Sequence, residues 1–224
     1  MPSATVEDYL KALYQLEQQD SAKARIKDIA SLLDVSLPSV TTMMKSLDDS
    51  GFVERTAYRG VSLTEQGRLA ALRVIRNHRL IELFLVEVLG YTWDEVHAEA
   101  ERLEHAMSDM LTNRIDKYLG YPRVDPHGDP IPDASGKIEK LKTHSILELP
   151  AGSTATVERV MEQAADVLQY LTSKGIRPGV ELHIEELEPF DGPLWVQVDG
   201  KRTTLSRSLA SRVHVACTTS NAPD

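Results

Sequence analysis

The segment Gly120–Gly136 constrains the fold most, because GYPRVDPHGDPIPDASG holds four prolines and three glycines, too many for regular structure. Before it, apolar residues recur at helical spacing. After it, ATVERV, ELHIEEL, LWVQVD and RVHVAC alternate or carry β-branched residues, and one helix is expected at about 162–174. The chain is therefore predicted to be mainly α with a small β module of the barrel type.

Composition narrows the classes of protein that fit. The hydrophobic content of 42% is ordinary for a globular protein, and no apolar run is long enough to span a bilayer. The start MPSATVEDYL lacks the features of a signal peptide, so we expect a soluble, cytoplasmic protein without a membrane partner. With only Cys217 available, any metal site must use His, Asp and Glu. The net charge of −9 gives no support for DNA binding, which must rest on a motif.

The first 70 residues contain such a motif. Helical spacing predicts a helix in TVEDYLKALYQLEQ, started by a capping box from Thr5 to Asp8, and a second helix over 26–35. A third follows over 36–51, capped by Ser36 and stopped by Gly51. FVERTAYRGVSLTEQG then predicts a hairpin. This order is typical of a winged helix-turn-helix, although a helical hairpin that merely packs is the alternative.

In a winged helix-turn-helix, the start of the third helix faces base edges and the wing contacts the DNA backbone. The candidate DNA-binding residues are Ser36, Pro38, Ser39, Thr41, Thr42 and Lys45 in the helix, and Arg55, Tyr58 and Arg59 in the wing. Because Arg, Asn and Gln are missing among the helix residues, water bridges and DNA shape are expected to carry much of the specificity.

Two longer helices are predicted next, over about 64–88 and from the cap at Thr92 to about Leu119. In the second, Glu101, Glu104 and His105 share one face, and His97 lies a turn earlier; the first carries His78 and Glu82. If the helices pack antiparallel, three carboxylates and three imidazoles come near one zone, which suits Mn(II), Fe(II) or Zn(II). The alternative is a solvated helix face. HExxH is absent, and Arg102 occupies the place where a di-iron Glu-x-x-His motif needs Glu.

The winged helix, HRLIELFL, VHAEAERLEHAMSD, the DPHGDPIP loop and the β module together resemble the diphtheria toxin repressor family. Its members are metal-dependent transcriptional repressors and include manganese transport regulators. The resemblance covers essentially the whole chain. It implies a winged helix-turn-helix domain over 1–70, a helical metal-binding and dimerisation domain over 71–142, and an SH3-like barrel over 147–224.

The resemblance also implies two metal sites. The primary site would use Asp8, His78, Glu101, Glu104 and His105, and the ancillary site Glu82, His97, Asp125, His127, Gln163 and Asp166. For His127 the alternative is an exposed loop histidine. Iron-responsive members carry Cys at the position of Glu101 and Met at that of Asp8, so the harder set here favours Mn(II), with Fe(II) as the alternative. Two-metal manganese regulators carry Glu where this chain has Lys11, which puts a two-metal centre in doubt.

The family dimerises through its second domain, so we expect a homodimer on an inverted-repeat operator in double-stranded DNA. The apolar area for that contact is assigned to Val96, Met107, Met110, Leu111 and Ile115. No small-molecule substrate and no enzymatic activity are expected, because the sequence holds no nucleophile motif and no phosphate loop. A metalloenzyme and a metal-storage or transport-accessory protein are the rival classes.

Overall fold

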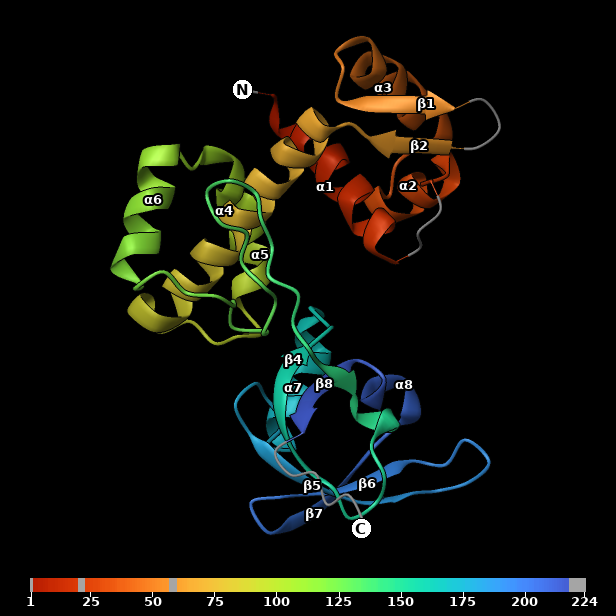
Figure 1. The fold of residues 1–224 in the computed structure, drawn as a ribbon, viewed down its shortest axis with the longest axis vertical. Coiled ribbons are helices and arrows are strands. Elements are labelled where there is room, and N and C mark those ends of the chain that lie inside the picture. Colours follow the sequence, from red (N-terminus) through yellow and green to blue (C-terminus); the bar gives the residue numbers. More distant parts are fainter. Residues whose placement is uncertain (1, 20–22, 57–59, 218–224) are drawn as a thin grey trace. The chain divides into compact units, whose positions relative to one another are not determined.

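The third helix shows most directly how sequence determines local structure in this chain. A computed structural model describes residues 2–19, 23–56 and 60–217 (Figure 1). The helix begins where Ser36 Oγ accepts a hydrogen bond from the Ser39 N–H at 3.3 Å, and Pro38 lies in its first turn. Val40, Met44 and Leu47 are buried at helical spacing. The predicted cap is confirmed, and so is the stop, since the helix ends at Asp49 and Gly51 follows with φ of +76°.

The chain divides into two compact units, each described separately: residues 1–78, 101–113 and 132–138 in the first, and residues 79–100, 114–131 and 139–224 in the second. The longest helix passes from one to the other. The elements before the proline-rich segment are α1 (Ala4–Gln19), α2 (Ile26–Leu33), α3 (Leu37–Asp49), β1 (Val53–Thr56), β2 (Gly60–Leu63), α4 (Glu65–Leu89), α5 (Val96–Leu103), the 3₁₀ turn η1 (Glu104–Ala106) and α6 (Asp109–Tyr118).

The first three helices and the hairpin share one apolar core. Leu10 and Leu13 of α1 pack with Ile29 of α2 and Met44 of α3, and all four are fully buried. β1 and β2 pair antiparallel with Val53 opposite Leu63, and a bridge between Ala24 and Val61 ties the hairpin to the segment before α2. The winged helix-turn-helix is thereby confirmed, and its buried core rules out a bare helical hairpin.

The start of α1 differs from the prediction. The helix begins at Ala4, so Thr5 lies inside it instead of capping it. Ser3 takes the capping role, since its Oγ accepts a hydrogen bond from the Val6 N–H at 3.4 Å and its carbonyl accepts one from the Glu7 N–H at 3.0 Å.

The predicted continuous helix from Thr92 to Leu119 is wrong. The Thr92 N–H donates a hydrogen bond to the Glu95 side chain at 3.0 Å, as in the predicted cap, but the α-helix begins only at Val96. The α-helix then ends at Leu103, tightens into η1, and restarts at Asp109, where Ser108 Oγ accepts a hydrogen bond from the Leu111 N–H at 3.2 Å. Glu101 therefore belongs to a different element from Glu104 and His105.

The proline-rich segment Gly120–Gly136 is a series of turns, as predicted, with one bridge between Val124 and Pro130. It lies against strand β4 (Thr154–Val160), because the carbonyl of His127 accepts a hydrogen bond from the Val160 N–H at 2.8 Å. Gly128 fits this close approach with φ of +85°, and a Cβ atom at that position would lie 1.9 Å from the carbonyl oxygen of Glu158.

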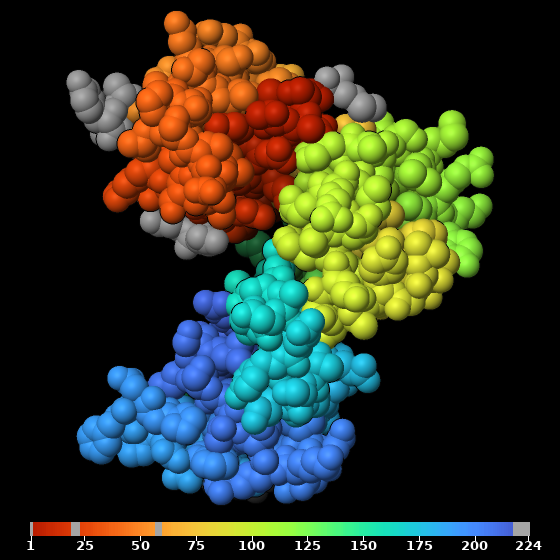
Figure 2. All heavy atoms as spheres, turned by 180° about the vertical axis from the view of Figure 1, so that it is seen from behind, coloured from red at the N-terminus to blue at the C-terminus, as the bar shows by residue number. Residues whose placement is uncertain are grey.

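The C-terminal residues, cyan to blue in Figure 2, form the predicted β module. A six-stranded antiparallel sheet with order β3-β8-β4-β5-β6-β7 surrounds an apolar core that includes Leu168, Ile184 and Val215. Strand β7 was not predicted. The other elements are β3 (His144–Ser145), η2 (Ile146–Glu148), α7 (Ala165–Ser173), β5 (Glu181–Leu187), β6 (Leu194–Val198), β7 (Lys201–Leu205), α8 (Arg207–Ala210) and β8 (Val213–Cys217).

Among the residues that the structure describes, no helix combines the length and the apolar character needed to cross a bilayer.

Gly128→Ala tests the contact between the proline-rich segment and β4. We expect the substitution to lower the free energy of unfolding by about 2–4 kcal/mol, because it adds a clash to the cost of a left-handed backbone. Gly120→Ala is the matched control, since Gly120 has φ of +77° but a Cβ there would meet no atom within 4 Å. It should cost only about 1 kcal/mol. Urea unfolding followed by tryptophan fluorescence measures both, and equal losses would contradict the contact.

Candidate metal centre and nucleic-acid interface

The outer face of α3 carries the residues that were predicted to meet DNA. Ser36, Pro38, Ser39, Thr41, Thr42 and Lys45 are all exposed. On the opposite side, the fully buried Val40 and Met44 fix the helix to the core, so the exposed face is held rigidly. Arg55 is exposed on β1. Tyr58 and Arg59 lie outside the described residues and stay predictions.

Two hydroxyls on this face already use their protons. Thr41 Oγ1 donates to the carbonyl of Leu37 at 2.9 Å, and Thr42 Oγ1 donates to the carbonyl of Pro38 at 3.0 Å. Each oxygen therefore keeps only its acceptor capacity, which suits the amino groups of adenine and cytosine or a bridging water.

A cluster of charged side chains, which we call the first centre, joins four elements of the first unit. Its residues are Glu7, Asp8 and Lys11 on α1, His78 on α4, Glu101 on α5, and Glu104 and His105 on η1. Glu104 is fully buried, whereas the Asp8 side chain is 42% exposed. Glu104 thus lies at the closed interior of the cluster, whereas Asp8 and Glu101, whose side chain is 43% exposed, reach solvent at its edges.

His105 lies between two carboxylates of α1. Its Nδ1 donates to Glu7 Oε2 at 2.7 Å, and its Nε2 donates to Asp8 Oδ1 at 2.8 Å. Burial lowers the pKa of His105, but the hydrogen bond with Glu7 and the charges of Asp8 and Glu104 outweigh it and raise the pKa above its ordinary value. The imidazolium form therefore satisfies both contacts when no metal is bound.

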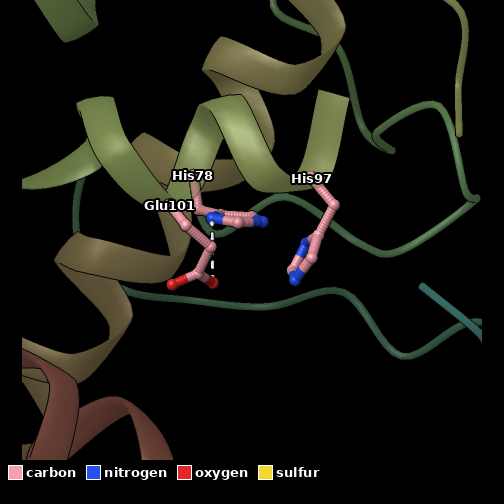
Figure 3. Close-up of side chains that lie close together, drawn as sticks. All are labelled: His78, His97 and Glu101. Carbon is pink, nitrogen blue, oxygen red and sulfur yellow. Dashed lines mark ion pairs between the residues drawn. The ribbon is translucent and has the colours of Figure 1, made fainter. Parts of the chain in front are cut away.

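Glu104 is the hub of the first centre. Its Oε2 lies 2.5 Å from His78 Nδ1, and its Oε1 lies 3.4 Å from His105 Nε2. The side chains of His78 and Glu101 point toward one another, with 3.7 Å between His78 Nδ1 and Glu101 Oε1 (Figure 3). One oxygen of Asp8, one oxygen of Glu104 and one nitrogen of His105 lie within 4.8 Å of one another, close enough to share a single ion.

Lys11 enters the same cluster from α1. Its Nζ donates to Glu101 Oε1 at 2.7 Å and to Glu104 Oε2 at 2.8 Å. From the sequence, Lys11 was significant only because it put a two-metal centre in doubt. The structure gives it three anionic contacts, because Glu104 Oε1 also lies 2.9 Å away.

Glu7 is a second residue that the sequence analysis missed. It is buried, and besides His105 it faces the guanidinium of Arg73, with Nη1 at 3.7 Å from its Oε1. A carboxylate that holds one nitrogen of a ligating histidine fixes the ring and leaves the other nitrogen for the metal. In the sequence, Glu7 is marked only by its place directly before Asp8. This is a weak signal, because the side chains of adjacent helix residues point in different directions.

A second centre lies within the second unit and consists of Glu82, Asp125 and His127, with His97 beside it. The first three are buried, and each offers one ligand atom close enough to the others to share an ion. His97 Nδ1 lies 3.3 Å from Glu82 Oε1. Glu82 therefore also meets the proline-rich segment, through His127 Nδ1 at 3.7 Å from its Oε2. His127 is fully buried, so the alternative of an exposed loop histidine is wrong.

The second centre has the electrostatics of a cation site. His127 Nε2 donates to the carbonyl of Trp93 at 2.7 Å, which leaves Nδ1 facing Glu82 Oε2 at 3.7 Å and Asp125 Oδ1 at 4.0 Å. Burial and the carboxylates of Asp129 and Glu82 raise the pKa of Asp125 to about 7. Burial lowers the pKa of His127, but Glu82 and Asp125 outweigh it and raise the pKa. A proton or a cation relieves this excess of buried negative charge.

Two predicted ancillary residues are not brought to the second centre. Asp166 and Gln163 are exposed near the start of α7, and Asp166 Oδ1 accepts a hydrogen bond from the Val167 N–H at 2.9 Å. Within the described ranges, neither has a side-chain contact with Glu82, Asp125 or His127. Their roles as ligands stay predictions.

Both centres offer only carboxylate oxygens and imidazole nitrogens. This donor set fits a borderline or hard divalent ion, and the buried repulsion among the carboxylates supplies a reason to bind one. A winged helix-turn-helix whose first helix contributes to such a centre defines a class of protein: a DNA-binding regulator with an intrinsic metal site.

Comparison with known proteins agrees with this class. Residues 1–61 match the N-terminal DNA binding domain of iron dependent repressors, residues 64–133 match their metal binding and dimerisation domain, and residues 144–217 match the FeoA domain. The chain is 34% identical to the iron-dependent repressor IdeR of Mycobacterium tuberculosis (strain H37Rv) over 94% of this chain and 96% of that protein.

Two further relatives extend the comparison. The chain is 30% identical to the diphtheria toxin repressor of Corynebacterium diphtheriae, over 94% of this chain and 96% of that protein. A solved manganese-dependent transcriptional repressor in complex with manganese superposes with a TM-score of 0.87 at 38% identity, covering 95% of this chain and 99% of that one. The chain therefore belongs to the family of metal-dependent transcriptional repressors that includes IdeR and the diphtheria toxin repressor. Membership confirms the predicted family and the prediction that the chain is not an enzyme.

The residues assigned to dimer contacts need a correction. Val96, Met107 and Ile115 are buried within the chain itself, at 0%, 5% and 5% exposed, so they are not available to a partner. Met110 and Leu111 remain exposed on α6, at 70% and 45%. α6 also ends with the exposed Tyr118, which adds apolar surface there.

Proposed function

We propose that the protein is a Mn(II)-dependent repressor that binds an inverted-repeat operator as a homodimer and controls genes of metal homeostasis. One observation carries the proposal: Asp8, on the first helix of the winged helix-turn-helix, lies in one centre with Glu104 and His105 of η1. These two residues fall in the segment 64–133 that matches the metal binding and dimerisation domain. Fe(II) is the alternative effector, because IdeR and the two matching domain families are named as iron-dependent repressors. The protein would act in the cytoplasm, where its DNA is.

The proposed primary site consists of Asp8, His78, Glu101, Glu104 and His105, and the proposed ancillary site is centred on Glu82, Asp125 and His127. A bound divalent cation supplies positive charge shared by the carboxylates and the imidazoles. Asp8 then holds α1 against η1, Glu7 keeps the His105 ring in place, and α3 stays in the one orientation that fits DNA. We expect a bias of about 1–3 kcal/mol per subunit between fitting and non-fitting orientations.

The three-part division into residues 1–70, 71–142 and 147–224 remains a proposal. The matched segments 1–61, 64–133 and 144–217 support it. In this division the second domain provides the dimer contact through Met110 and Leu111. Two copies related by a two-fold axis present two α3 helices to successive major grooves, which is why the operator should be an inverted repeat.

A gel shift against the protein's own upstream DNA, with Mn(II) and with EDTA, tests the proposal. Binding that appears with Mn(II) and disappears with EDTA supports it. Equal binding under both conditions contradicts metal dependence, and no binding to any upstream region contradicts the repressor function.

Asp8→Ala should weaken Mn(II)-dependent operator binding by about 10–100-fold, because α1 loses its contact with His105. The fold should persist, since the Asp8 side chain is 42% exposed. Glu139→Ala removes an equal charge from an exposed position, at 61% exposure, and serves as the control. Operator titration at fixed Mn(II) with circular dichroism measures both. Wild-type affinity of the Asp8 variant would contradict the role of this contact.

Glu101→Cys should shift metal preference from Mn(II) toward Fe(II) or Zn(II), because a thiolate is a softer donor than a carboxylate. Ala98→Cys places a thiol at an exposed position of the same helix and controls for non-specific binding. Competitive metal titrations measure the ranking. An unchanged order of affinities in the Glu101 variant would count against selectivity by donor hardness.

Mn(II) affinity should fall as pH decreases from 8 to 6, by up to about tenfold per pH unit for each proton displaced. His105 has a raised pKa and must lose its proton to bind metal, so the loss begins at a higher pH than for a free imidazole. Glu7→Gln removes one cause of the raised pKa and should move the decline to lower pH. Calorimetric titrations over this range measure both proteins, and pH-independent affinity would contradict the role of His105.

A further inference from the structure

The Lys11 side chain extends from α1 and places a positive charge inside the first centre. It lies three residues after Asp8, so both side chains leave the same face of the helix. Lys11 is buried, with 11% of its side chain exposed, beside the fully buried Glu104. Burial of a lysine at such a position requires anionic partners.

The partners of the Lys11 ammonium are the atoms that a divalent ion would use. Nζ lies 2.7 Å from Glu101 Oε1, 2.8 and 2.9 Å from the two oxygens of Glu104, and 3.3 Å from His78 Nδ1. An ammonium has three N–H donors, and these neighbours surround it on the side that faces the cluster. The position defined by His78, Glu101 and Glu104 is therefore already filled by positive charge.

Glu104 separates this position from a neighbouring one. Its Oε1 faces both Lys11 Nζ at 2.9 Å and His105 Nε2 at 3.4 Å. On the far side, the ligand atoms of Asp8, Glu104 and His105 lie within 4.8 Å of one another. Two cation positions thus share one carboxylate, as in two-metal sites, where the ions lie about 3.5–4 Å apart.

We infer that the Lys11 ammonium serves as a built-in second cation, so that the first centre takes a single divalent ion, on the side of Asp8, Glu104 and His105. This inference rests on the proposed function, because it assumes that the first centre binds metal. His78 Nδ1 and Glu101 Oε1 position the Lys11 ammonium next to that ion. Lys11 sets the metal stoichiometry of the centre.

The same contacts give Lys11 a role before metal arrives. Glu101 and Glu104 belong to the segment that follows α4, and their charges repel each other unless a cation lies between them. Lys11 supplies that cation from α1, which connects the winged helix to α5 and η1 at all times. Only the Asp8 and His105 side of the centre is left to respond to the metal supply.

Electron paramagnetic resonance of the Mn(II)-loaded wild-type protein tests the inference directly. Two Mn(II) ions that share the Glu104 carboxylate are spin-coupled, whereas a single ion at the first centre gives the six-line signal of isolated Mn(II). An ion at the second centre adds only to the isolated signal. We expect isolated Mn(II) alone, and a coupled pair in the wild-type protein would overturn the inference.

Lys11→Glu replaces the built-in cation by a ligand. We expect the variant to bind about one more Mn(II) per chain after equilibrium dialysis and to show a coupled pair. Lys140→Glu makes the same change at an exposed lysine and should leave the metal count unchanged. A folded Lys11→Glu protein with the wild-type metal count would overturn the inference.

Lys11→Met keeps the length of the side chain and removes only its charge. The metal-free variant should have a lower melting temperature than the wild-type protein, because Glu101 and Glu104 lose their cation. Its rise in melting temperature on addition of Mn(II) should be larger. Equal melting temperatures without metal would contradict the role of Lys11 as a structural cation.

These measurements separate the inference from the proposed function. A coupled pair in a wild-type protein that binds operator DNA only with Mn(II) defeats the inference and leaves the proposed function intact. Equal Mn(II) uptake by the Asp8→Ala variant and the wild-type protein would defeat both the inference and the proposed function, because the first centre would then hold no ion.

Discussion

Charge balance at the first centre is the constraint on which the rest of the structure depends. Four carboxylates, from Glu7, Asp8, Glu101 and Glu104, converge there from three elements. Without positive charge among them the segment after α4 would be pushed away from α1. Lys11, Arg73 and the raised pKa of His105 supply that charge from within the chain. Ionic contacts within the chain therefore already connect the winged helix to α5 and η1. A divalent ion would change the strength of these contacts but is not needed to form them.

The interruption after Leu103 gives this balance its geometry. In a continuous α-helix, Glu101, Glu104 and His105 would share one face and point in one direction. The 3₁₀ turn η1 changes the spacing, so that the buried Glu104 receives Lys11 and His78 while His105 reaches back to Glu7 and Asp8. The break is thus part of the site, as short 3₁₀ segments at functional positions often are.

Much of this could be predicted from sequence, for physical reasons that differ between elements. The winged helix has strong local signals, such as the Ser36 cap and the positive-φ Gly51. The helix break has almost none, because apolar spacing continues across it and the Ser108 cap is a single residue. The contacts of Lys11 depend on how three separate elements pack. Asp166 and Gln163 were assigned by resemblance, and the structure does not bring them to the second centre.

The difference in burial between the two centres has a kinetic consequence. The Asp8 carboxylate at the edge of the first centre is 42% exposed, so an ion there can leave in steps, exchanging each ligand for water. Glu82, Asp125 and His127 are buried, and release from them requires the proline-rich segment to move away from β4. Residence times should therefore be short at the first centre and long at the second. With ions at both proposed sites, the protein would follow a changing metal supply at the first centre while retaining a lasting occupant at the second.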